Sequence, residues 1–142
     1  MTLKSEELFK KAVEFNASDV HITVDEYPIY RVDGELQIYK AWDVLTDSAV
    51  REIIFGLCSP EQKELLLINK ELDFSVSPGG VARFRVNAFF QKGFLAASCR
   101  RIPNEVPNLT KLLLPPILME LCRLPQGLIL VTGPSGHGKS TT

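Results

Sequence analysis

The first hundred residues carry apolar and polar side chains in patterns that predict helices and strands in groups. Residues 19 to 24 alternate polar and apolar side chains, which is typical of a strand with one buried face. Before them, residues 5 to 15 have helical spacing of their apolar side chains, which are Leu8, Phe9, Ala12, Val13 and Phe15. We therefore expect a helix followed by a half-buried strand.

Two further short runs, 29–32 and 35–39, lie on either side of Asp33-Gly34. A two-residue type I′ turn needs positive φ at both central positions, and Asp-Gly meets that need well. These runs are therefore predicted to form a β-hairpin.

Capping residues indicate two helices after the hairpin. Thr46 or Asp47 can cap the first, whose apolar side consists of Val50, Ile53, Ile54 and Leu57. The second begins with Ser59 as N-cap and Pro60 at N1, and Gln62 can close a capping box. Its apolar residues Leu65, Leu66 and Ile68 are expected in the core.

Three more strands are expected, over 72–76, 81–91 and 94–102, joined at Pro78-Gly79-Gly80 and Lys92-Gly93. Helices and strands are grouped rather than alternating. The predicted fold class of this first part is therefore α+β with a mostly antiparallel sheet.

The pattern changes after residue 103. Two prolines and no apolar period indicate a linker over 104–108. Residues 109–124 are predicted to be helical, with an interruption at Pro115-Pro116, and Leu128–Val131 is a continuous apolar run. Such a run is typical of a parallel strand buried on both faces, so residues 109–142 are predicted to begin an α/β domain.

Composition excludes several classes of protein. The chain has 142 residues, enough for one domain or for a small domain with part of another. A net charge of −1 lacks the basic excess of a nucleic-acid-binding domain. We find no apolar run of about 18 residues and no signal-peptide pattern, so no membrane insertion is expected. The three cysteines, Cys58, Cys99 and Cys122, have no metal-site spacing and are expected to be buried reduced thiols.

The most specific motif lies at the end of the chain, where residues 133–141 match the phosphate-loop pattern G-x-x-x-x-G-K-[ST]. Glycines let successive backbone N–H groups point inward at an anion, and the loop leads into a helix N-terminus that favours negative charge. Lys139 can reach the β- and γ-phosphates of ATP, and the Ser140 hydroxyl can ligate Mg²⁺. The residues expected to hold the nucleotide are Gly133, Pro134, Ser135, Gly136, His137, Gly138, Lys139, Ser140 and Thr141.

A chance match to a glycine-rich turn is the alternative, and the apolar strand pattern directly before the loop argues against it. The acids and sensors that ATP hydrolysis requires do not follow Lys139 within these 142 residues. We therefore expect the chain to stop where a second domain starts, and to bind nucleotide weakly without turning it over.

Four arginines fall within nineteen residues of an otherwise near-neutral chain: Arg83, Arg85, Arg100 and Arg101. The first two share one face of their predicted strand, and Arg100 lies on the next strand. Such a face can bind a phosphate anion. The alternative is a solvated face paired with acids such as Asp73 and Glu71.

Several blocks of sequence resemble one family, the PilT-type retraction ATPases of type IV pili within the secretion-ATPase superfamily. The blocks in chain order are Ala17–His21, Tyr30–Leu36, Cys58–Gln62, Glu71–Ser75, Ala82–Phe89, Arg100–Pro103 and Leu124–Pro134. Together they cover nearly the whole chain, and the A-R-F-R-V-N and G-L-I-L-V-T-G-P blocks are the most specific.

The resemblance implies a PAS-like domain over 1–103, a linker, and the start of a RecA-like ATPase domain over 109–142. It implies a ring of six subunits in which ATP hydrolysis drives pilin disassembly, working with an inner-membrane platform protein at the cytoplasmic face of the inner membrane. It also implies that Arg83, Arg85 and Arg100 reach the nucleotide phosphates, with Arg101 a weaker match. The family's Walker B, Asp-box and His-box residues lie beyond Thr142, and His137 departs from the small residue that is usual at its position.

Two rival functions stay open. One is a pilus-assembly or type II or type IV secretion ATPase, although the early start of the PAS-like unit favours retraction. The other is a non-catalytic module for oligomerisation or interaction.

Two other features have simpler explanations beside functional ones. Asp19 and His21 are expected to form a structural hydrogen bond rather than to take part in acid–base catalysis. Trp42 is either a contact residue or a half-buried aromatic.

Overall fold

The computed structural model describes residues 5–103, 108–134, 137–139 and 141–142. It divides into two units, residues 1–104 and residues 105–142.

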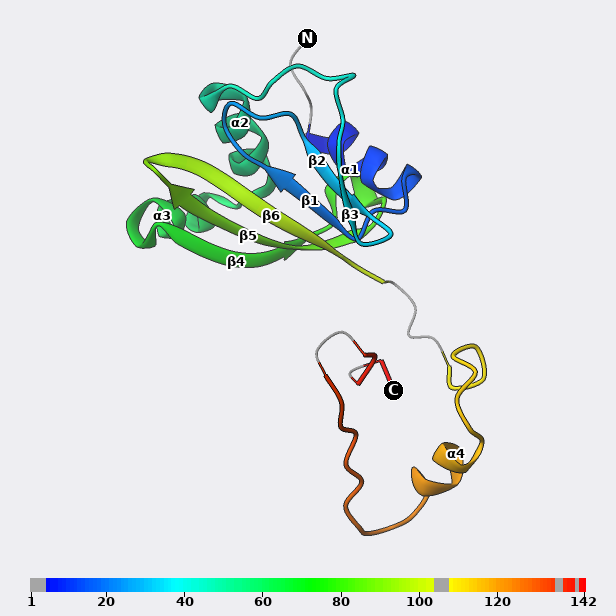
Figure 1. Cartoon of the computed structure of the whole chain (residues 1–142). Coiled ribbons are helices and arrows are strands. Elements are labelled where there is room, and N and C mark those ends of the chain that lie inside the picture. The colour runs from blue at the N-terminus through cyan, green and yellow to red at the C-terminus, as the bar shows by residue number, and fades with distance from the viewer. Residues whose placement is uncertain (1–4, 104–107, 135–136, 140) are drawn as a thin grey trace. The chain divides into compact units, whose positions relative to one another are not determined.

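The first unit is an α+β fold built on one six-stranded sheet (Figure 1). Its order along the sheet is β3-β2-β1-β6-β5-β4, and every neighbouring pair is antiparallel. The strands are β1 (Asp19–Ile22), β2 (Ile29–Val32), β3 (Glu35–Ile38), β4 (Glu71–Val76), β5 (Arg83–Gln91) and β6 (Phe94–Ile102). The predicted α+β class with an antiparallel sheet is thus confirmed.

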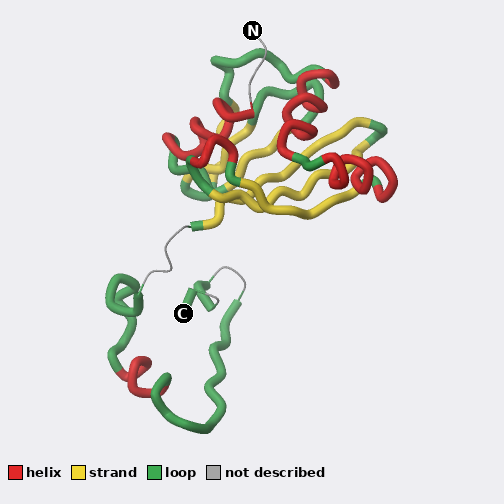
Figure 2. Tube along the Cα trace, turned by 180° about the vertical axis from the view of Figure 1, so that it is seen from behind, coloured by secondary structure: helices red, strands yellow, loops and turns green. Residues whose placement is uncertain are grey.

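Three helices, α1 (Ser5–Glu14), α2 (Asp47–Leu57) and α3 (Pro60–Asn69), complete this unit, with a 3-10 turn at Pro78–Gly80 between β4 and β5. The helices gather on one side of the sheet and leave the opposite face open (Figure 2). The core fills the space between them. Its largest buried side chains include Leu8, Phe9, Tyr30, Ile53, Ile54, Phe84 and Val86.

Local signals in the sequence set the element boundaries. Thr46 is the cap of α2, because its Oγ1 accepts a hydrogen bond from the Ala49 N–H at 3.2 Å. Ser59 and Gln62 form the predicted capping box of α3. In the β2–β3 turn, φ is +50° at Asp33 and +86° at Gly34, as a type I′ turn requires.

Helix α3 corrects one expectation. Of its three predicted core residues only Leu66 is buried, whereas Leu65 is exposed and Ile68 is 74% exposed. The helix packs at the β4 edge of the sheet, where one row of side chains is enough to fill the contact.

The second unit departs further from the predicted pattern. The helix expected over 109–124 is reduced to α4 (Ile117–Leu121), and residues 108–114 form hydrogen-bonded turns before it. The prediction of a buried strand at Leu128–Val131 is wrong for this structure: no strand is assigned there, and Leu128 and Leu130 are 83% and 75% exposed. A strand needs a neighbouring strand to pair its backbone, and the described part of this unit contains none.

Candidate functional site

The open face of the first unit's sheet brings two of the predicted arginines together. Arg85 on β5 and Arg100 on β6 are direct cross-strand partners, so their side chains leave the sheet on the same face. Arg83 lies on that face one step further along β5, opposite Ile102. Arg101 is paired with the buried Phe84 and therefore belongs to the other face.

Arg85 is held by an acid on the neighbouring strand β4. Its Nε lies 3.0 Å from Asp73 Oδ1, and its Nη2 donates to Asp73 Oδ2 at 2.6 Å. This bidentate pair is largely exposed to solvent. The hydrogen bonds from Arg85 hold the pKa of Asp73 below its usual value, and Asp73 raises the pKa of Arg85. Arg83 donates to Ser75 Oγ at 3.0 Å.

Arg100 is held by a different acid in a different way. Its Nε donates to Asp19 Oδ1 at 2.8 Å, and the Asp19 side chain is only 7% exposed. The Ser18 hydroxyl donates to Asp19 Oδ2 at 2.8 Å, and Arg31 Nε lies 3.5 Å from the same oxygen. Burial alone raises the pKa of Asp19, but the hydrogen bonds from Arg100 and Ser18 outweigh it, so this pKa lies below its usual value.

These groups line a shallow groove of about 250 Å³. Its lining consists of Asp19, Asp73, Arg85, Asn87, Ser98 and Arg100, from strands β1, β4, β5 and β6. The two positive and two negative charges of the lining balance. Both interpretations of the arginines therefore find support: they share a face, and acids of this unit pair with them. Glu71, however, accepts a hydrogen bond from Asn87 rather than from an arginine.

The sequence predicted that Asp73 could pair with the arginine face, but it did not predict the pairing of Asp19 with Arg100. These two residues are 81 positions apart, and only the β1–β6 pairing places them opposite each other. The structural hydrogen bond expected between Asp19 and His21 is absent from the described residues. His21 Nε2 is buried without a hydrogen-bond partner among the described residues, and burial lowers the pKa of this histidine.

The predicted phosphate loop lies in the second unit. Gly138 has φ of +79°, a conformation that favours glycine, and its carbonyl accepts hydrogen bonds from the N–H groups of Thr141 and Thr142. Lys139 reaches back along the loop, and its Nζ donates to the Pro134 carbonyl at 2.5 Å. Gly133 and His137 belong to the same loop. Ser135, Gly136 and Ser140 lie outside the described residues.

Lys139 therefore folds over its own loop, and a Cβ added at Gly133 would come within 4.0 Å of the Lys139 side chain. That contact is made by the Cγ methylene of Lys139, while its ammonium group is held at the Pro134 carbonyl. The loop and the groove belong to separate units, so the structure brings together Arg85 and Arg100 but does not relate either to Lys139.

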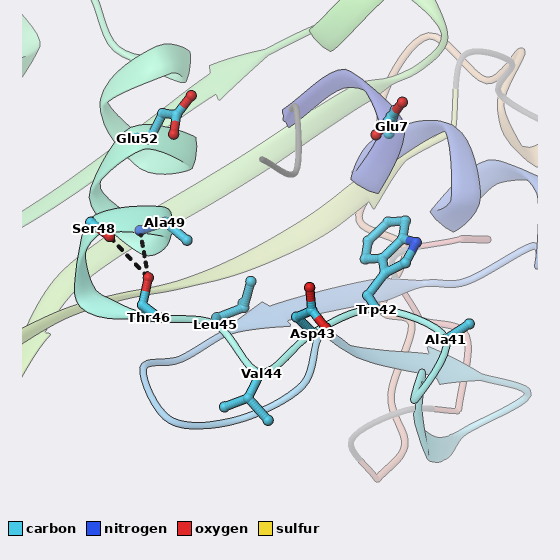
Figure 3. A pocket seen from close by; sticks show the side chains of 10 residues that line it. All are labelled: Glu7, Ala41, Trp42, Asp43, Val44, Leu45, Thr46, Ser48, Ala49 and Glu52. Carbon is cyan, nitrogen blue, oxygen red and sulfur yellow. Dashed lines mark hydrogen bonds between the residues drawn. The ribbon is translucent and has the colours of Figure 1, made fainter. Parts of the chain in front are cut away.

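A second hollow, of about 410 Å³, lies between α1, α2 and the loop over 41–46 (Figure 3). Trp42 lines this hollow and is half-buried. Its ring packs edge-on against two tyrosines, with ring-centroid distances of 5.4 Å to Tyr39 and 6.3 Å to Tyr30. The half-buried aromatic is thus the interpretation that the structure favours for Trp42.

The described residues contain neither a candidate metal site nor a candidate membrane-spanning helix. Within these ranges no three His, Cys, Asp or Glu side chains gather in a way that could hold a metal ion. No helix in the described part of the chain is long and apolar enough to cross a membrane.

No protein-family model matches the chain. Among curated proteins, it is 34% identical to the type IV pilus ATPase PilU of Pseudomonas aeruginosa over 140 residues, which cover 99% of this chain and 36% of PilU. It is 37% identical to the type IV pilus retraction ATPase PilT of the same organism over 136 residues, which cover 96% of this chain and 39% of PilT.

Among solved structures, the chain is similar to the crystal structure of the pilus retraction motor PilT with bound ADP. The TM-score is 0.86 and the identity 42%, over 98% of this chain and 40% of that one. The chain therefore spans about two fifths of the length of the proteins it matches.

Proposed function

This chain is a homologue of the PilT-type pilus ATPases of the secretion-ATPase superfamily, and from that homology we propose that it is the nucleotide-binding part of a pilus motor. The observation that carries the proposal is the match of the chain along nearly its whole length to the structure of a pilus retraction motor with bound ADP. The phosphate-loop motif at residues 133–141 supports the same role.

In this proposal, residues 1–103 form a PAS-like domain, residues 104–108 a linker, and residues 109–142 the start of a RecA-like ATPase domain. The division of the chain into units of residues 1–104 and 105–142 supports the boundary between the two domains. The exposed apolar run at Leu128–Val131 supports the last assignment, because such a run suits the centre of a parallel sheet.

The phosphate loop holds ATP through its backbone N–H groups and the ammonium group of Lys139. Gly138 is in the backbone conformation that such a loop needs, and Lys139 already lies against the loop carbonyl of Pro134. The Ser140 hydroxyl holds Mg²⁺, which when bound neutralises negative charge on the phosphates.

Arg83, Arg85 and Arg100 act as a clamp that reaches the phosphates when the two domains approach each other. Guanidinium groups suit this role because they bind phosphate oxygens bidentately. The cross-strand pairing of Arg85 with Arg100 supports it, because two guanidinium groups on one face can bind one anion together.

The whole protein then works as a homo-hexamer that retracts type IV pili by disassembling pilin, at the cytoplasmic side of the inner membrane, with the inner-membrane platform protein of the pilus machinery as its partner. The relatives, which are pilus retraction and type IV pilus ATPases, support the pilus-retraction role in this proposal.

Removal of the Lys139 ammonium group tests the proposal in the full-length gene product. Lys139→Ala is expected to lower ATP turnover by about 100-fold or more, because loss of one charged donor at developing phosphate charge has an effect of that order. Lys10→Ala, which removes an exposed lysine from α1, is the control and should turn over ATP at the wild-type rate. Wild-type turnover by the Lys139 variant would reject the phosphate-loop assignment.

The non-catalytic alternative is tested with the 142-residue chain. An ATPase assay beside analytical ultracentrifugation shows whether this chain assembles without hydrolysing ATP. Assembly and partner binding that stay intact in the full-length Lys139→Ala protein, together with no measurable ATPase activity in its wild-type form, would favour an interaction module over a motor.

A further inference from the structure

Asp19 lies between two arginines on the open face of the sheet. It is the cross-strand neighbour of Arg31 on β2 and of Arg100 on β6, because β1 lies between these two strands. Side chains of directly paired residues leave a sheet on the same face. The Asp19 carboxylate, which is 7% exposed, therefore has a guanidinium group on each side.

The two arginines depend on Asp19 to different extents. Arg31 also donates from Nη1 to the Gly34 carbonyl at 2.9 Å, so the β2–β3 turn holds it as well. The Arg100 side chain is 75% exposed, and the bond from its Nε to Asp19 Oδ1 at 2.8 Å is its one side-chain hydrogen bond among the described residues. The direction of the Arg100 guanidinium group is therefore set by Asp19.

The bond to Asp19 leaves most of this guanidinium group available to another ligand. A guanidinium has five N–H donors, one on Nε and two on each terminal nitrogen. Asp19 accepts the Nε donor, and the four donors on Nη1 and Nη2 of Arg100 have no acceptor among the described residues. An oriented guanidinium with a complete Nη1–Nη2 edge can bind two phosphate oxygens at once.

Asp19 is itself held in place through its other oxygen. The Ser18 hydroxyl donates to Oδ2 at 2.8 Å, and Arg31 Nε lies 3.5 Å from the same atom, whereas Oδ1 accepts from Arg100. A buried carboxylate with partners on both oxygens has little freedom to turn. It can therefore fix the position of a long, exposed side chain that binds to it.

We propose that Asp19 is a positioning residue for the phosphate clamp: it holds Arg100 by Nε and leaves both terminal nitrogens free for the phosphates. This inference rests on the proposed function, because it assumes that Arg100 meets a nucleotide. Ordering a long side chain during binding costs affinity, so an Arg100 that is already oriented binds more tightly. Arg31 offsets the charge of Asp19, and the one aspartate and two arginines together keep a net charge of +1.

The sign of the effect on binding separates positioning from charge alone. Asp19→Asn keeps the size of the side chain and removes its negative charge, which would tighten the binding of an anion if charge were the whole role. The amide, however, cannot present an acceptor oxygen to Arg100 on one side and to Ser18 and Arg31 on the other. If Asp19 orients Arg100, the substitution therefore weakens binding.

Nucleotide binding by the full-length gene product tests this role, with a fluorescent ADP analogue as the probe. Asp19→Asn is expected to weaken binding by about two- to tenfold, the cost of ordering one long side chain. In the Arg100→Ala background the same substitution should not weaken binding, because no guanidinium is left to orient. The matched control is Asp47→Asn, which makes the same charge change in a pair with Arg51 on α2 and should leave binding unchanged.

A milder variant covers the case in which Asp19→Asn does not fold, which circular dichroism shows. Ser18→Ala keeps the Asp19 carboxylate and its charge but removes the hydroxyl that holds Oδ2. It is expected to weaken binding by about twofold, again only while Arg100 is present. Unchanged binding by a folded Ser18→Ala protein would then overturn the positioning role.

The results distinguish this inference from the proposed function. If Arg100→Ala weakens binding but Asp19→Asn leaves it unchanged or tightens it, the positioning role is wrong and the clamp stands. Equal weakening by Asp19→Asn with and without Arg100 would mean a general effect on the fold, which also rejects positioning. If Arg100→Ala does not change binding, Arg100 is not part of the clamp and the role of Asp19 falls with it.

Discussion

The two units of the chain differ in the burial of their apolar residues. In the first, Phe84 and Val86 on β5 are completely buried between the sheet and its helices. In the second, Leu128 and Leu130 are similarly apolar and lie two positions apart in a segment with no assigned helix or strand, yet most of their surface is exposed. The difference shows that apolar character alone does not bury a residue.

Partners account for the contrast. β5 has β4 and β6 on its two sides, so its backbone is paired and its apolar face is covered. The segment over 128–131 has no strand beside it among the described residues, so neither condition is met. A run that suits the centre of a sheet therefore stays exposed to solvent.

The largest expected effect comes from a pair of truncations, one in each unit of the 142-residue chain. Phe84→Ala removes a ring that packs 4.6 Å from the ring of Phe9, and it should cost about 3–5 kcal/mol of unfolding free energy. Leu130→Ala should cost less than about 0.5 kcal/mol, because the side chain is already exposed. Urea denaturation followed by circular dichroism measures both.

The same two substitutions can also contradict the proposed difference in burial between the two units. A cost above about 2 kcal/mol for Leu130→Ala in the 142-residue chain would mean that this segment is packed in solution. In a longer protein that supplies neighbouring strands, the cost of this substitution should rise toward that of Phe84→Ala. Measurement in both proteins separates a property of the segment from a property of its partners.

A smaller effect is expected from the buried carboxylate of the first unit. Asp19→Asn should cost about 2 kcal/mol at neutral pH, because Arg100 and Ser18 lose a charged acceptor. Since the pKa of Asp19 is lowered in the folded protein, its contribution to stability is present above the ordinary aspartate pKa and is lost as the pH falls through the lowered value.

The stability curve against pH checks this sign. The wild-type chain should lose stability on acidification more steeply than Asp19→Asn, and the two curves should converge at low pH. Asp47→Asn, in an exposed pair with Arg51, should cost less than about 1 kcal/mol. If wild type and Asp19→Asn lost stability in parallel as the pH falls, the lowered pKa of Asp19 would be contradicted.

The mildest test changes no residue and compares cysteines. Cys122 in the second unit is exposed, whereas Cys99 on β6 is fully buried and its pKa is raised by burial. A thiol reagent should label Cys122 at once in the native chain, and Cys99 only after denaturant is added. Mass spectrometry of the labelled peptides identifies the sites. Rapid native labelling of Cys99 would show that the sheet opens more easily than its packing indicates.

The cysteines also show what the sequence could not supply. All three were expected to be buried, and the structure buries Cys99, partly covers Cys58 and exposes Cys122. Burial of a small apolar residue depends on what packs around it, and no local pattern records that. The same reason explains Ile68, which has the spacing of a core residue but lies on the open side of α3.

Signals that act within a few residues were predicted well. The Asp33-Gly34 turn and the Ser59 capping box both have the expected geometry, because a turn or a cap depends on its own backbone and the next few side chains. The alternation along β5 correctly placed Arg83 and Arg85 on the open face for the same reason.

Local patterns were therefore enough to predict the elements of the first unit, the arginine face and the phosphate-loop motif, since each depends on neighbouring residues. The folded structure was needed to show that Arg85 faces Arg100, that Asp19 binds Arg100 and Asp73 binds Arg85, and that Leu128–Val131 is exposed. Strand order and the presence of a partner depend on contacts between distant parts of the chain. Such contacts form only when the whole sheet assembles, and a local pattern does not specify them.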